Sequence, residues 1–199
     1  MSFPVSVTVD VQEEPRERLT VALRPILAIP HVILVGPGWW FHRAGSAGLL
    51  GAAAYVLAVV NWFAILVSGE PVAGTRDFQL YYLRWRTRAL AYMALFADAY
   101  PPFGDAPYPA SIEVTAPVGP RDRATVAVRL LLAVPHLVML FFLAFAWFIA
   151  TIVAWVSILV NGTYPPSLRP FCLGVMRWML RVEAYLLLLV DAYPPFALD

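Results

Sequence analysis

The sequence predicts a mainly α-helical, integral membrane bundle built from two tandem copies of one module. Composition is the first reason, because 61% of the 199 residues are hydrophobic and 14% are charged, whereas roughly 25% are charged in soluble domains. The run from Ala124 to Val160 contains one ionised side chain, Arg129, and exceeds the roughly 20 apolar residues that cross a hydrocarbon core. An internal repeat divides the chain into modules at 1–104 and 105–199.

The repeat is read from two constant spacings. The segment PRERLTVALRPILAIPH (15–31) aligns with PRDRATVAVRLLLAVPH (120–136) at an offset of 105 residues. The segment DAYPPF (98–103) recurs at 191–196, at an offset of 93. The difference predicts a 12-residue insertion in the first module, between His31 and Asn61.

Each module begins with a segment in which apolar and polar residues alternate, as in a half-buried strand. We expect strands at 5–11 and 110–114. Because a lone strand is not stable, these two segments should pair with each other or with a partner chain. The expected result is a small cytoplasmic β-ribbon.

The Arg-rich segments lead into a helical run that reaches Pro-His in each copy. Proline kinks or ends a helix, so we expect a short interfacial or half-inserted helix there, followed by a full span at 136–160. In the first module the span is expected at 49–67, after Gly, Pro, His42 and Arg43 break the helix.

The last helix of each module, expected at 78–97 and 171–190, has the length to cross but carries several charges. Each charge at a helix centre costs roughly 2.5–3.5 kcal/mol on the insertion scale. If these helices lie in the interface instead, each module crosses once and the copies are inverted. That alternative separates the two strands and opposes the positive-inside tendency, so we favour about four transmembrane helices, with the N-terminus in the cytoplasm.

His31 and His136 occupy equivalent positions, each directly after a proline. Paired imidazoles on separate helices can ligate haem or a metal. The alternative, which we favour, is that each histidine bonds a carbonyl freed by the proline. No HxxxH, CxxC or carboxylate cluster is present, so we expect no metal, no cofactor and no catalytic residue.

Arginines are the other candidates. Arg24 and Arg129 each precede a histidine by seven residues, which places both side chains on one helix face, where they could hold a lipid phosphate or simply snorkel. Two further pairs with i,i+4 spacing could bind headgroups or form a basic stripe beside them, with Asp98 and Asp191 as partners if the helices pack suitably. These pairs are Arg84 with Arg88 and Arg177 with Arg181.

The order of the motifs PRxR, R-x5-PH, a long apolar span, RW-x2-R-x3-Y and DxYPPF resembles the membrane-protein family catalogued as domain of unknown function 4389. The resemblance covers about residues 3–103 and 108–198. It implies a duplicated integral membrane protein of bacteria, located in the inner (plasma) membrane, with no assigned activity and no established catalytic residues.

The leading functional expectation is a non-enzymatic inner-membrane protein that acts by association, as an accessory or scaffold subunit or as a homo-oligomer. Its expected partners are membrane lipids and other subunits, and a net charge of +1 gives no argument for nucleic acid. The alternative is a lipid-binding or transport protein with a site at the repeat interface. A haem or metal enzyme that uses His31 and His136 is the third hypothesis.

Overall fold

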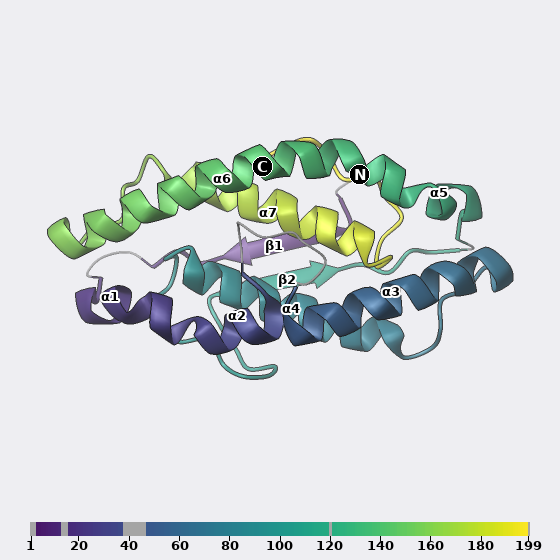
Figure 1. The fold of residues 1–199 in the computed structure, drawn as a ribbon, viewed down its shortest axis with the longest axis horizontal. Coiled ribbons are helices and arrows are strands. Elements are labelled where there is room, and N and C mark those ends of the chain that lie inside the picture. The colour runs from purple at the N-terminus through teal and green to yellow at the C-terminus, as the bar shows by residue number, and fades with distance from the viewer. Residues whose placement is uncertain (1–2, 13–15, 38–46, 120, 199) are drawn as a thin grey trace.

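The computed structural model describes residues 3–12, 16–37, 47–119 and 121–198. Within these residues the chain forms seven helices and one two-stranded sheet (Figure 1). In chain order the elements are β1 (Val5–Val9), α1 (Arg18–Leu27), α2 (Ile29–Val35), α3 (Gly48–Ser68), α4 (Thr75–Met93), β2 (Ala110–Val114), α5 (Arg123–Ala127), α6 (Arg129–Asn161) and α7 (Arg169–Leu186).

The two predicted strands pair with each other, in antiparallel orientation. Val7 lies opposite Ile112, and Ile112 is also the residue that the repeat aligns with Val7. A pseudo-two-fold axis therefore passes between these residues and relates the two modules. The inner face of the ribbon is buried or half-buried, and its outer face exposes Ser6, Thr8, Ser111 and Glu113.

The predicted break at the second Pro-His is wrong, because α6 continues through Pro135 for 33 residues. In the first module the same region bends by 42° between α1 and α2. That module has a second proline, Pro25, inside α1, where the second module has Leu130. A second missing backbone donor and a second ring clash explain why only the first copy is broken here.

One helical path is interrupted at the insertion and continues after it. The interruption begins at Gly36 and ends at Gly48, which lie so close that a Cβ atom on Gly48 would be 2.5 Å from the backbone of Leu34 and Gly36. The residue number advances by 12 from Gly36 to Gly48, which matches the predicted insertion length. Together α2 and α3 thus correspond to most of α6. The predicted helix breakers His42 and Arg43 lie outside the described residues.

The long helices form one layer and the sheet another (Figure 1). The path α1–α2–α3 runs along one edge of the molecule and α6 runs along the other in the opposite direction, in front of the sheet. Between the two layers lie α4 and α7, which pack against β2 and β1 respectively. Nearly every residue in the second half of α4 and most of α7 are buried, so these two helices form the core.

The four-span arrangement is not confirmed. Two described helices, α3 and α6, are long and apolar enough to cross a membrane, and the bent pair α1–α2 is a third candidate. The expected second crossings, α4 and α7, are not among the candidates. These helices direct charged residues such as Arg86 and Arg177 toward partners inside the protein.

Candidate functional site

Equivalent arginine clamps hold the C-terminal ends of α4 and α7. In the first module the Asp98 carboxylate accepts hydrogen bonds from Arg16 at 2.5 Å and from Arg24 at 2.9 Å. Arg24 also donates to the carbonyls of Tyr92 and Ala97, at 3.0 and 2.9 Å. Two guanidinium groups thus satisfy carbonyls that the end of α4 leaves free, where the helix dipole favours positive charge.

The second module repeats this clamp with equivalent residues. Arg121 and Arg129 reach the Asp191 carboxylate at 2.8 and 2.7 Å, and Arg129 also donates to the carbonyls of Tyr185 and Val190. Asp98 and Asp191 are therefore engaged by arginines other than the i,i+4 pairs considered for them. Arg24 and Arg129 are almost fully buried, at 3% and 2% exposure, and most of their donors are committed inside the protein.

The electrostatics of the first clamp favour ionised Asp98. Burial raises the pKa of this carboxyl, but hydrogen bonds from Arg16 and the Glu17 amide, together with the charges of Arg16 and Arg24, hold the pKa below its ordinary value. The clamp is therefore a persistent ion-pair network at neutral pH.

Each candidate histidine is enclosed by aromatic residues of its own module. The indole N–H of Trp85 donates to Nδ1 of His31 at 3.0 Å, and Phe103 of the DAYPPF segment stacks on the ring. His136 has the same arrangement with Trp178 and Phe196. Because Nδ1 accepts a hydrogen bond, the neutral ring carries its proton on Nε2.

This geometry gives the histidines a packing role. A protonated Nε2 is not a metal ligand, and among the described residues no group of three His, Cys, Asp or Glu side chains could hold a metal. The histidines bond indoles, not the carbonyls freed by the prolines as we expected. The phenylalanine of each DAYPPF segment thereby covers one face of an imidazole ring.

The i,i+4 arginine pairs line two equivalent clefts beside the ribbon. Arg84 and Arg88 face the segment 106–113 across a cleft of about 340 Å³. Arg177 and Arg181 line a cleft of about 770 Å³ with residues of the N-terminal strand. Arg88 donates to the Ala106 carbonyl at 3.2 Å and Arg177 to the Val7 carbonyl at 3.3 Å, so both clefts lie on the side of the molecule away from the long helices.

An ion pair that the sequence interpretation missed joins the two modules in the core. Arg86 of α4 donates to Glu183 of α7 at 2.6 Å, and their side chains are 2% and 5% exposed. The Tyr82 hydroxyl donates to the other carboxylate oxygen at 2.6 Å. The repeat alignment could have indicated this pair, because each charged residue aligns with an apolar residue of the other module: Arg86 with a methionine and Glu183 with a leucine.

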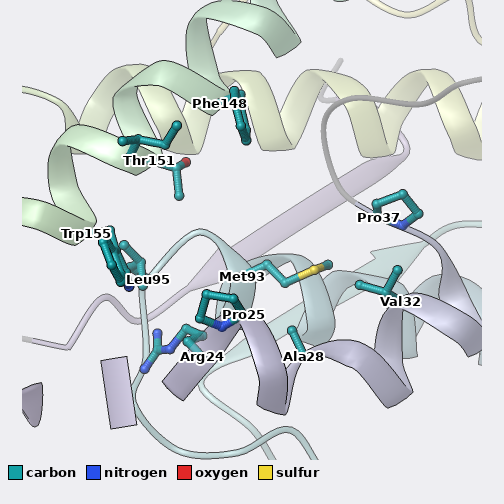
Figure 2. A pocket seen from close by; sticks show the side chains of 11 residues that line it. Arg24, Pro25, Ala28, Val32, Pro37, Met93, Leu95, Phe148, Thr151 and Trp155 are labelled. Atoms are coloured by element: carbon teal, nitrogen blue, oxygen red, sulfur yellow. The ribbon is translucent and has the colours of Figure 1, made fainter. Parts of the chain in front are cut away.

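The feature best suited to hold a ligand is an apolar cavity between the modules (Figure 2). Its volume is about 440 Å³, within the roughly 300–1,000 Å³ of small-molecule sites. One wall comes from α1 and α2, the opposite wall from α6, and the floor from the end of α4. The lining residues are Arg24, Pro25, Ala28, Val32, Pro37, Met93, Leu95, Phe148, Thr151, Ile152 and Trp155.

Two residues that carry polar groups, Arg24 and Thr151, belong to this otherwise apolar lining. The Nε atom of Arg24 is buried and has no hydrogen-bond partner among the described residues. Thr151 donates its hydroxyl proton to the Trp147 carbonyl at 2.9 Å, so the hydroxyl oxygen can still accept a bond. A ligand for this cavity would therefore be long and apolar, with at most a small polar part.

The cavity lies where the first module departs from the second. Pro25 and Ala28 lie at the bend between α1 and α2, and both line the cavity. At the aligned positions the second module has Leu130 and Ala133 on helices that continue without a 12-residue insertion. We attribute the cavity to this 42° bend between α1 and α2, which has no counterpart within the continuous helix α6.

Comparison with known proteins identifies the repeat. The family model described as Domain of unknown function (DUF4389) matches residues 39–104 and 123–197, more than half of the chain. The chain belongs to this family. The two matches confirm the resemblance and its tandem duplication. No curated protein and no solved structure matches the chain.

Proposed function

We propose that the protein is a membrane-associated lipid-binding protein that holds one apolar lipid chain in the cavity between its modules. The observation that carries the proposal is the 440 Å³ apolar cavity at the repeat interface. Duplicated membrane modules commonly form their site at such an interface.

The surroundings of the cavity support a lipid as the occupant. The helices that form its walls expose large apolar side chains over most of their length, among them Leu23 and Ile152 at 44% and 46%. A lipid chain in the surrounding bilayer can thus reach the cavity without passing through water. Binding is favoured because burying each CH₂ group is worth about 0.8 kcal/mol.

Arg24 sets the polar contact in this proposal. Its free Nε–H donor is charge-assisted and can bond an ester or phosphate oxygen, while its other nitrogens stay on Asp98 and the α4 carbonyls. Because this Nε atom is buried, a small movement of the neighbouring side chains must open it to the cavity before a ligand oxygen can bond it. The bonds to Asp98 and the α4 carbonyls still hold the guanidinium in place, and preorganisation of this kind lowers the entropic cost of binding.

A matched pair of substitutions tests the cavity. Ile152→Trp fills it from the α6 wall, whereas Val59→Trp places the same side chain at the equivalent position of the first module, outside the cavity. Both positions are exposed, at 46% and 57%, so both variants should fold. After delipidation, the purified protein is titrated with palmitoyl-oleoyl phosphatidylglycerol and examined by native mass spectrometry.

We expect one tightly held lipid on the wild type and on Val59→Trp, and at least tenfold weaker retention on Ile152→Trp. Equal retention by both variants would remove the cavity from the proposal. The association role predicted from the sequence, as a scaffold subunit or homo-oligomer, stays a prediction, since no described feature specifies a protein partner.

A further inference from the structure

The direction of the long helices decides how the protein sits in a membrane. Because the pseudo-two-fold axis passes between Val7 and Ile112, it is perpendicular to the ribbon and to both long helical paths, which run antiparallel (Figure 1). If the helices crossed the membrane, this axis would lie in the membrane plane. If they lie along the membrane, the axis coincides with the membrane normal.

The length of the apolar surface argues against crossing. At 1.5 Å per residue, the 33 residues of α6 extend about 50 Å, and the helix exposes apolar side chains from Leu130 at 70% to Val160 at 67%. A hydrocarbon core is about 30 Å thick. Fitting α6 across it would need a tilt of more than about 50°, outside the 0–40° range of transmembrane helices.

The position of the ribbon argues in the same direction. It lies near the middle of the long helices in Figure 1, and its outer face exposes Ser6, Thr8, Asp10, Ser111 and Glu113. In a crossing arrangement these groups would meet hydrocarbon at its centre, where each charge costs roughly 2.5–3.5 kcal/mol. Unpaired strand edges would be there as well, which lipid does not tolerate.

The surface of the long helices instead differs in polarity from the surface of the rest of the molecule. Among the described residues of α4 and α7, no large apolar side chain is exposed, whereas α1, α2, α3 and α6 carry most of those on the molecule. A helix is about 10–12 Å in diameter, which fits within one leaflet of about 15 Å, half of the hydrocarbon core. One leaflet can therefore cover the long-helix layer while the ribbon remains in water.

We propose that the protein is monotopic: both long helical paths lie in the plane of one leaflet, and the ribbon faces the aqueous phase on the same side. The occupant of the apolar face is the lipid of that leaflet. This inference does not depend on the cavity, although a leaflet covering both helices would also cover the space between them.

Accessibility to a membrane-impermeant maleimide tests the arrangement at both ends of the helical path. In a Cys172→Ala background, cysteine replaces Glu17 before α1, Glu70 after α3 or Thr8 on the ribbon, all of which are exposed. Labelling is compared in intact spheroplasts and in inverted membrane vesicles. We expect all three positions to react from the same side, and reaction of Glu17→Cys and Glu70→Cys from opposite sides would overturn the proposal.

Depth measurements give an independent readout. Leu131, Phe142 and Val153 follow one another at 11-residue intervals on α6, with exposures of 71%, 64% and 50%, and 11 residues return a helix to nearly the same face. A bimane label on cysteine at each position is quenched with nitroxide lipids of shallow and deep placement. The same depth at all three sites supports the monotopic arrangement.

Two outcomes of the depth measurement would contradict it. Labels at opposite depths along α6, separated by most of the roughly 33 Å between Leu131 and Val153, would indicate a crossing helix. Absence of lipid quenching at all three sites would indicate that a second copy of the chain, not lipid, covers this face. The Ile152→Trp experiment tests the cavity alone. Its outcome can go against lipid binding there without changing the labelling result or the depth result.

Discussion

Replacing the Arg86–Glu183 pair should have strongly non-additive effects on stability. Removing one partner leaves the other charge buried, which costs about 3–5 kcal/mol. Arg86→Met and Glu183→Leu each do this while introducing the residue that the other module has at the aligned position, Met179 or Leu90. In a protein of this size about 1 kcal/mol changes the unfolding temperature by 2–4 °C, so each single variant should lose about 6–20 °C.

The double variant should be no less stable than either single one. Replacing a whole buried ion pair with apolar residues is often neutral or stabilising by about 1–4 kcal/mol. This gain is offset because the Tyr82 hydroxyl and the Val35 carbonyl each lose a partner, at about 1–3 kcal/mol each. Independent effects would instead sum to about 6–10 kcal/mol.

The wild type, the two single variants and the double variant form a double-mutant cycle. Their unfolding temperatures are measured in one detergent, from the amount of protein that remains soluble and monodisperse after heating. Gel filtration before heating confirms that each variant is folded. A double variant whose loss equals the sum of the two single losses would refute the reasoning, because it would show that the two charges do not compensate each other.

Three further predictions concern single features. Asp98→Asn should make the stability less sensitive to acid. The pKa of Asp98 is held below the ordinary 3.8, so its stabilisation is present above the unfolded pKa and is lost as the pH falls through the folded pKa. Unfolding temperatures of both proteins between pH 3 and 6 check this. His31→Leu removes the acceptor of the Trp85 indole and should cost about 1–3 kcal/mol in a thermal melt, and an unchanged melt would contradict the bond. Gly48→Ala should prevent stable folding, because its Cβ atom would lie 2.5 Å from backbone atoms. The control Gly74→Ala meets nothing within 4 Å and should cost only about 1–2 kcal/mol for its positive φ. The yield of monodisperse protein measures both.

The sequence predicted the elements of the fold better than their orientation. Alternation predicted both strands, and the repeat predicted the length of the insertion. The instability of a lone strand predicted that each strand pairs, either with the other strand or with a partner chain, and the structure shows the first of these. Hydropathy could not distinguish a helix that crosses lipid from one that lies in it, since both expose apolar residues all along their length. The charges on α4 and α7 were compatible with arginines that snorkel to the interface or that face the bundle interior, and the structure shows partners inside the protein for Arg86 and Arg177.

The candidate site was predicted only in its general location. The repeat interface was one of the expected places, but the cavity depends on a bend between α1 and α2, and no local pattern specifies how far a proline tilts a helix. Arg24 and His31 were singled out because they recur. Recurrence here marks the contacts that build each module, and Pro25 and the Arg86–Glu183 pair, which do not recur, mark the features in which the two modules differ.

The register of the ribbon has a consequence for the history of the protein. When a strand pairs with its own repeat equivalent about a two-fold axis, the same contact can form between two separate chains. A single-module ancestor would thus have been complete as a homodimer, and gene fusion would have made its two halves a single polypeptide. Once fused, each half could change alone, which a homodimer does not permit. Cutting the chain in the connection at 115–119 should therefore leave two fragments that reassemble.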